Sequence, residues 1–132
     1  PSALEKAAQV TIAVIVGPEV VAGSTRMKAG TAQKMVLNML STTAMIRLGK
    51  VYQNFMVDMI PTNQKLKQRA QHIVVECTGV SPERAANYLK EAQWNIKAAI
   101  IMAKVNCNYD RAQELLARSE GVVGRALELA GA

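Results

Sequence analysis

The run of residues from Gln9 to Val16 constrains the fold more than any other segment. It reads Gln-Val-Thr-Ile-Ala-Val-Ile-Val, is rich in β-branched side chains and has no polar face. Such a run is typical of a strand that is buried on both sides, as in a parallel sheet covered by helices. Gly17 and Pro18 end it. Because a single strand is no sheet, we expect its partner strands either on another chain or in sequence that precedes Pro1.

The composition fits a packed domain with an aliphatic, Met-rich core. The chain has 132 residues, of which 50% are hydrophobic and only 4% aromatic. This length predicts one domain, or one and a half, and the composition excludes disordered, collagen-like and disulfide-rich chains. The sequence starts at Pro1 without an initiator Met, so we expect it to be a piece of a longer protein.

Positive charge is concentrated in the first part of the chain. The 16 basic and 10 acidic residues give a net charge of +6. Residues 1–78 hold nine of the basic and four of the acidic ones, and residues 79–132 hold the other seven and six. An anionic ligand is therefore expected to bind to the first part.

The cysteines and the apolar segments indicate the compartment. Cys77 and Cys107 each lie in an apolar helical pattern, with no His or Cys at ligand spacing, so two buried free thiols in a reducing compartment are favoured over a disulfide. Every apolar run is shorter than the roughly 18 residues of a membrane span. The first residues lack the charge order of a signal peptide. We expect a soluble, cytoplasmic protein.

Apolar periodicity predicts a series of helices. A long helix is expected from about Thr31 to Leu48, with Gly49 as its stop, and its stripe of Met35, Met39 and Met45 is expected to form core or a dimer seam. An irregular connector should follow, with four apolar side chains tucked onto the helices: Tyr52, Phe55, Met56 and Met59.

Further helices are expected in the second half of the chain. They should run over residues 63–78, from a Ser81 cap, from an Asn95 cap over 96–105, from Asn108 or Asp110 to 118, and over about 121–129. His72 has no second ligand nearby and is expected to be a partly exposed helix residue rather than a metal ligand. Trp94 should anchor the small bundle.

The segment between Glu19 and Lys34 carries the chemistry. Ser24, Thr25, Arg26 and Lys28 follow the Gly23 turn and place hydroxyls, backbone N–H groups and two cations near the N-terminus of a helix. That combination predicts a phosphate or sugar-phosphate site. The glycine spacings of nucleotide and dinucleotide loops are absent. The alternative is that the hydroxyls cap the helix and the two cations are only solvated.

Residues 17–34 resemble a family signature. The segment Gly-Pro-Glu-Val-Val-Ala-Gly-Ser-Thr-Arg-Met-Lys-Ala-Gly-Thr-Ala-Gln-Lys is similar to that of the N-acetylmuramic acid 6-phosphate etherase and glucokinase regulatory protein family of sugar isomerase (SIS) domains. The continuation, with Asn54, 56–58 and Thr62-Asn63-x-Lys65-Leu66, resembles the bacterial etherase branch more closely. The resemblance covers essentially the whole chain, and the family's N-terminal half precedes Pro1.

The resemblance implies both a fold and an activity. Residues 1–62 would be the C-terminal part of a three-layer, parallel-sheet α/β SIS domain, 63–78 a connecting helix, and 79–132 a small helical bundle, so that this chain is mainly α. The implied protein is a cytoplasmic homodimer that cleaves the D-lactyl ether of N-acetylmuramic acid 6-phosphate in cell-wall recycling, by elimination and then hydration. It would use no cofactor or metal and bind neither nucleic acid nor membrane.

The resemblance also assigns roles to residues. Glu19, Ser24, Thr25, Arg26 and Lys28 would line the sugar-phosphate pocket, with Arg26 as the strongest candidate because its planar fork can bind a phosphate or a sugar hydroxyl bidentately. For Glu19, a cap on the Gly23 turn is an equal alternative. The catalytic acid and base are expected in the family's N-terminal half, so this chain is assigned no catalytic residue.

A second resemblance lies in residues 78–103. The patterns Thr-Gly-Val-Ser-x-x-x-Ala-x-x-x-Leu and Asn-Ile-Lys-x-Ala-Ile-Ile are similar to three-helix ubiquitin-associated (UBA) modules, and a lid or dimer-packing role is expected for them here. The rival interpretation of the whole chain is a non-catalytic sugar-phosphate sensor that acts through a protein partner.

Overall fold

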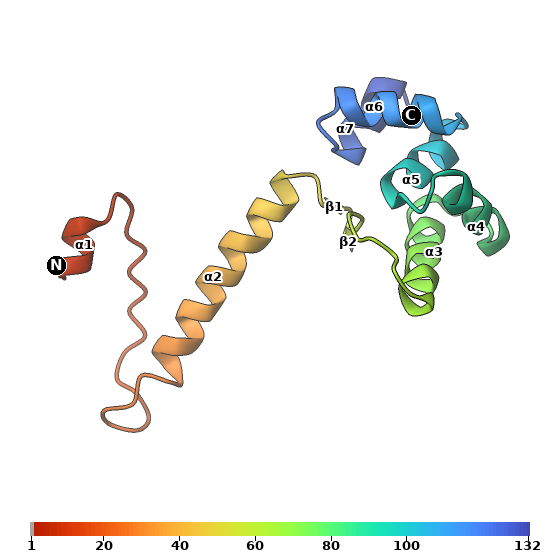
Figure 1. Cartoon of the computed structure of the whole chain (residues 1–132). Coiled ribbons are helices and arrows are strands. Elements are labelled where there is room, and N and C mark those ends of the chain that lie inside the picture. The colour runs from red at the N-terminus through yellow and green to blue at the C-terminus, as the bar shows by residue number, and fades with distance from the viewer. Residues whose placement is uncertain (1) are drawn as a thin grey trace. The chain divides into compact units, whose positions relative to one another are not determined.

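The computed structural model describes residues 2–132 and divides the chain into two compact units (Figure 1). One extends to Thr43 and the other comprises Ala44–Ala132. The elements, in chain order, are α1 (Ala3–Ala7), α2 (Lys28–Arg47), β1 (Val51–Tyr52), β2 (Phe55–Met56), α3 (Gln64–Thr78), α4 (Pro82–Glu91), α5 (Ile96–Val105), α6 (Tyr109–Arg118) and α7 (Val123–Ala130). The expectation of a mainly helical chain is confirmed.

The short helix α1 has no counterpart among the expected elements. Ser2 is its N-cap, and its hydroxyl accepts a hydrogen bond from the Glu5 backbone N–H at 3.1 Å. The Glu5 carboxylate in turn accepts from the Ser2 N–H at 3.2 Å, which completes a capping box. The Ser-x-x-Glu spacing is a known helix-start signal and could have identified this helix in the sequence.

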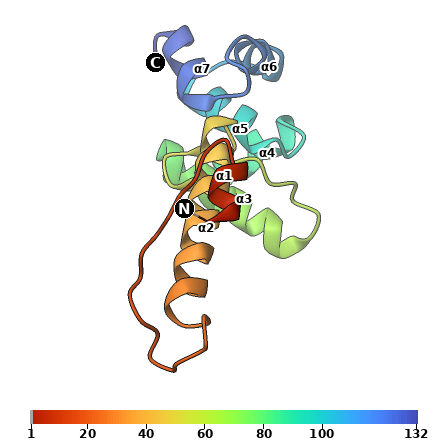
Figure 2. The same cartoon turned by 90° about the vertical axis from the view of Figure 1, so that its left-hand side faces the viewer.

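The buried strand predicted over residues 9–16 is not seen within residues 2–132, so this prediction is not confirmed. The segment carries no assigned strand, and most of its apolar side chains are exposed, Ile15 to 95%. Figure 2 shows it passing along α2 in the opposite direction. A strand exists only through hydrogen bonds to a neighbouring strand, and among the described residues none pairs with this one. The β-branched composition therefore produces an extended chain without a ladder.

Helix α2 confirms the long helix expected from Thr31, although it starts three residues earlier, at Lys28. It ends at Arg47, and Gly49 then adopts a left-handed backbone with φ of +69°. That conformation suits glycine and explains the stop. The methionine stripe lies in no core here, because Met35 and Met39 are exposed to 57% and 58%.

Residues 51–56 form a small hairpin where an irregular connector was expected. Val51 pairs with Met56, and Tyr52 pairs with Phe55, in antiparallel register. The turn contains no glycine, and Gln53 supplies the left-handed conformation instead, with φ of 54°, so the usual hairpin signal is missing from the sequence. Tyr52, Phe55 and Met59 pack against the helical core as expected, whereas Met56 stays half-exposed.

Helices α3 to α6 begin at side-chain caps. In each case a side-chain oxygen accepts a hydrogen bond from the backbone N–H three residues later, and the caps are Asn63, Ser81, Asn95 and Asn108. The predicted starts at Ser81 and Asn95 are confirmed, and Asn108 rather than Asp110 starts α6. Such caps satisfy N–H groups that the helix itself leaves without a partner.

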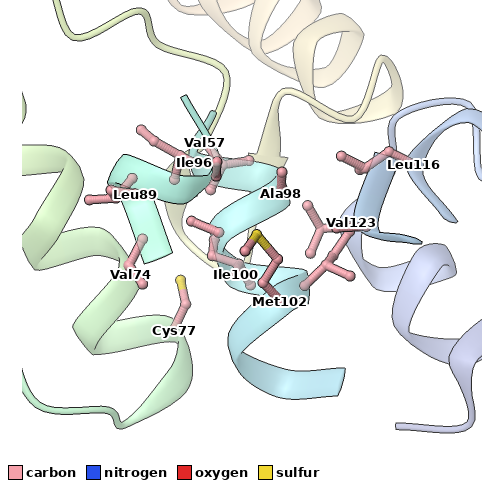
Figure 3. Packing of buried hydrophobic residues seen from close by; sticks show 14 of the residues in the cluster. Val57, Val74, Cys77, Leu89, Ile96, Ala98, Ile100, Met102, Leu116 and Val123 are labelled. Carbon is pink, nitrogen blue, oxygen red and sulfur yellow. The ribbon is translucent and has the colours of Figure 1, made fainter. Parts of the chain in front are cut away.

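The core of the unit formed by residues 44–132 is built around α5. This helix contacts α3, α4, α6 and α7, and six of its ten residues are buried. Figure 3 shows Val57 and Ile96 close together at the start of α5, and Ile100 and Met102 between the helices on its two sides. The core is aliphatic, as the composition predicted, with Ala70, Ile73, Val74, Cys77, Ala85, Leu89, Ala92, Ala112, Leu115 and Leu116 among its other members.

Removal of the Asn95 cap should destabilise this unit without unfolding it. The Asn95 side chain accepts from the Ala98 N–H at 3.1 Å, and loss of such a cap costs about 1 kcal/mol. Asn95→Ala is therefore expected to lower the free energy of unfolding by about that amount in urea titrations. Asn87→Ala, at an exposed position inside α4, is the control and should cost nothing. Equal effects of the two changes would contradict the capping role.

Candidate functional site

The sugar-phosphate candidates lie in the turn that leads into α2. Gly23 has a left-handed backbone with φ of +84°, and the Ser24 N–H donates to the Val21 carbonyl at 3.1 Å. The Ser24 hydroxyl accepts from the Arg26 N–H at 3.4 Å. The Thr25 carbonyl accepts from the Gly30 N–H at 2.8 Å. The turn is therefore closed by local hydrogen bonds and starts the helix.

Glu19 caps the N-terminus of α2. Its carboxylate accepts from the Lys28 N–H at 3.0 Å and from the Ala29 N–H at 3.0 Å. A negative charge at this end of a helix is stabilised by the helix dipole as well as by the two hydrogen bonds. Glu19 thus caps the helix rather than the Gly23 turn, which was the alternative expected from the sequence. Nine residues separate Glu19 from Lys28, so no local capping pattern could have shown it.

The two cations of the turn differ in their partners. The Lys28 ammonium donates to the Pro18 carbonyl at 2.7 Å and so ties the first turn of α2 to the start of the loop. The Arg26 side chain is exposed, and the part of the chain that the structure describes provides no hydrogen bond or ion pair for its guanidinium. Arg26 is therefore the candidate whose donors are available for an anion.

The arrangement limits how a phosphate could bind. The structure joins Glu19 to the backbone of Lys28 and joins Ser24 to the backbone of Arg26, and the side chains of Thr25 and Arg26 are exposed. The N–H groups of Lys28, Ala29 and Gly30 already have acceptors within the chain. An anion would consequently meet the Arg26 guanidinium and the hydroxyls rather than the free end of a helix.

Substitution of Glu19 should loosen the first turn of α2. Glu19→Ala removes the acceptor of two backbone N–H groups, and we expect a loss of about 1 kcal/mol in the local stability of that turn. Hydrogen exchange at the Lys28 and Ala29 amides would measure it. Glu19→Gln keeps an acceptor without the charge, so its exchange rates should lie between those of the wild type and of Glu19→Ala. Unchanged exchange in the alanine variant would show that Glu19 does not hold the helix end.

A second polar cluster joins distant parts of residues 44–132. The Asp58 carboxylate forms ion pairs with Lys50 and with Lys97, the latter at 2.9 Å, and the Lys97 side chain is only 12% exposed. Burial acts to raise the pKa of Asp58, but the hydrogen bonds and charges of the two lysines outweigh it and lower the pKa below its usual value. Sequence reasoning missed this cluster because its members lie far apart along the chain.

The Asp58 cluster predicts a pH dependence of stability. Because the folded-state pKa of Asp58 is lowered, its contribution is present above the unfolded-state pKa of about 4 and is lost as the pH falls through the folded value. Urea midpoints of the wild type should fall in that acid range. The Asp58→Asn variant should be less stable near neutral pH and converge with the wild type in acid. A constant gap between the two curves would contradict this assignment.

The cysteines and the histidine fit the unreactive roles expected of them. Cys77 is buried and Cys107 partly buried, and both are free thiols; burial raises the pKa of each. His72 is exposed and lies 3.8 Å from Glu76. Within residues 2–132, no group of three or more potential ligands could hold a metal ion, and no helix is long and apolar enough to cross a membrane.

Known proteins are similar in sequence to this chain over most of both units. Over 121 residues the chain is 54% identical to an N-acetylmuramic acid 6-phosphate etherase of Geobacillus thermodenitrificans, and 52% identical to the enzyme of that name from Shouchella clausii. The one from Bacillus cereus strain ATCC 10987 is 51% identical over 124 residues. The predicted resemblance to the etherases is confirmed. The matches cover 92–94% of this chain but only 41–42% of the etherases, so the chain spans about two-fifths of their length.

A family model matches the helical region separately. Residues 74–103 match a UBA-like domain, which confirms the resemblance seen in residues 78–103. The match runs from the last part of α3 through α4 to most of α5. The matched region therefore includes the end of the helix over residues 64–78.

Proposed function

We propose that this chain is part of an etherase that cleaves the D-lactyl ether of N-acetylmuramic acid 6-phosphate and yields N-acetylglucosamine 6-phosphate and D-lactate. The observation that carries the proposal is the identity of 50–54% to proteins with this name over 92–95% of the chain. Elimination of lactate followed by addition of water is the proposed course. The rival sensor function is not favoured, since these relatives carry the name of an enzyme.

The proposed role of this chain is to bind the sugar phosphate. Arg26 supplies a planar pair of donors that no other side chain engages among the described residues. Ser24 and Thr25 precede it in the same turn, and Lys28 begins the helix that follows. The Glu19 carboxylate supports this role indirectly, because its bonds to the Lys28 and Ala29 amides hold the turn in place. The acid and base of the reaction are proposed to lie outside these 132 residues, and no cofactor is proposed.

The proposed setting is an SIS domain of a cytoplasmic homodimer. Two features of the unit that ends at Thr43 support the SIS domain. The extended residues 9–16 and α2 line a shared groove of about 390 Å³ with apolar members such as Ile12, Val14 and Val36. The apolar side chains exposed on both are those that a parallel sheet covered by helices would bury.

The activity is tested with protein of the relatives' full length that contains this chain. Incubation with N-acetylmuramic acid 6-phosphate should release D-lactate, detected with a D-lactate dehydrogenase. N-acetylglucosamine 6-phosphate, which has no lactyl ether, is the substrate control and should release none. Binding of the muramic acid phosphate without any release of lactate would refute the etherase and favour the sensor.

Arg26→Ala in that protein should raise KM for the sugar phosphate more than tenfold, because a bidentate, charge-assisted contact contributes about 1.5–3 kcal/mol. The melting temperature should stay nearly unchanged, since the Arg26 side chain has no partner within residues 2–132. Lys34→Ala removes an exposed cation from α2, the helix that follows the turn; it is the control and should change KM far less. Unaltered kinetics in the Arg26 variant would exclude the binding role.

A further inference from the structure

The helices after α3 repeat with a fixed spacing. Helices α4 and α6 each have ten residues and begin 27 residues apart, at Pro82 and Tyr109. Helices α5 and α7 also begin 27 residues apart, at Ile96 and Val123. Figure 1 shows both pairs as short helices joined by tight turns. The same spacing relates the end of α3 at Thr78 to the end of α5 at Val105.

The backbone conformations recur with the same spacing. Gly79 and Asn106 both end a helix in the left-handed region, with φ of 74° and 54°. Ser81 and Asn108 are equivalent N-caps. At the next turn, two consecutive residues have positive φ in each case: Gln93 and Trp94, then Glu120 and Gly121.

The hydrogen bonds of those turns also correspond. The Trp94 N–H donates to the Leu89 carbonyl at 2.7 Å, and the Gly121 N–H donates to the Leu116 carbonyl at 2.8 Å. Left-handed residues other than glycine are uncommon, and three of these four residues are not glycine. Their recurrence at one spacing is therefore not produced by helix geometry alone.

The buried side chains follow the same register. At each of five positions, a buried residue of α4 or α5 corresponds to a buried residue 27 places later. The pairs are Ala85 and Ala112, Leu89 and Leu116, Ile96 and Val123, Ala99 and Ala126, and Ile100 and Leu127. The family model matched residues 74–103, which is the first of these two sets.

The first set consists of α3, α4 and α5, and the second consists of α5, α6 and α7. Helix α5 is therefore the third helix of the first set and the first helix of the second. This double use explains why Ala98 and Ile101 are fully buried on it. Their equivalents on α7 are Arg125 and Glu128, and both are exposed. A terminal unit of a repeat array needs such a polar outer face, so α7 closes the pair.

In each set, the turn before the third helix lies against the same segment, residues 49–61, which we call the connector. The first turn precedes α5 and the second precedes α7. In the second set, Gly49 is buried against that turn so closely that a Cβ there would lie 2.9 Å from the Gly121 carbonyl oxygen and 3.0 Å from Val122 Cγ2. In the first set, residues 57–61 and the Gln93–Ile96 turn line a groove of about 400 Å³.

Lys97 links the two places. It follows the first turn, and its ammonium pairs with Asp58 of the connector at 2.9 Å. It also lies near the second turn, since a Cβ on Gly121 would be 3.7 Å from Lys97 Nζ. A nearly buried ammonium is stable only when it is paired, which favours a docked connector over a free one.

We propose that α3–α7 are two copies of one UBA-like three-helix unit that share α5, and that the turn before the third helix of each copy is a docking site for connector residues 49–61 of this same chain. The partner of the bundle is then an internal segment rather than a free protein.

The test measures hydrogen exchange of the Lys50 and Val57 amides in the full chain. Their N–H groups donate to Met45 and Lys50 within the connector and its entry. Gly49→Ala should accelerate both amides at least tenfold more than Gly79→Ala does. Gly79 is the matched control, because its φ of +74° is equally unfavourable for alanine while a Cβ there meets nothing within 4 Å.

Lys97→Met tests the first copy without touching the backbone. It should accelerate the Val57 amide, whereas Lys104→Met, at an exposed position on the same helix, should not. Equal amide exchange in the Lys97 and Lys104 variants would overturn docking at the turn of the first copy, and equal exchange in the Gly49 and Gly79 variants would overturn it at the turn of the second. Both results together would overturn the proposal. Acceleration spread evenly over all helices in Gly49→Ala would also count against it, because it would reflect global destabilisation.

Discussion

The burial of α5 between two pairs of helices is the constraint on which the unit of residues 44–132 depends. A ten-residue helix is only marginally stable in water by itself. Helix α5 is stable because six of its residues are buried against the helices on its two sides. Each neighbouring pair needs the same helix to cover its own apolar face. The two halves of the bundle therefore fold together, and the connector that precedes them gains a surface on which Gly49 and Val57 are buried.

The candidate site follows a different principle, in which local hydrogen bonds rather than burial hold the turn. Glu19 uses its charge to cap α2, and Lys28 ties the helix back to the Pro18 carbonyl. These bonds consume the backbone donors that a bare helix end would present to a phosphate. What the turn still presents is the guanidinium of Arg26. An anion at the proposed site would be recognised by side-chain geometry more than by the helix dipole.

Part of the fold follows from patterns in the sequence. The long helix, the Gly49 stop and the caps at Ser81 and Asn95 were predicted because each depends on a few neighbouring residues. The buried strand over residues 9–16 was not realised, because a strand depends on partners that no composition can supply. The hairpin escaped prediction because Gln53 takes a conformation that glycine or asparagine usually signals. The 27-residue repeat has a trace in the sequence, as in Glu83-Arg-Ala and Asp110-Arg-Ala. It is recognised as a structural repeat only from the backbone conformations that recur at the same spacing.

The sequence by itself determined the family resemblance, the helical content, the free thiols and the residues of the candidate anion site, since all of these are short-range or compositional properties. Only the tertiary structure decided that Glu19 caps α2, that Asp58 joins Lys50 and Lys97, and that α5 belongs to two units at once. Each of these rests on contacts between residues that are separated along the chain. Such contacts depend on how the helices pack, and helical periodicity alone does not specify the packing.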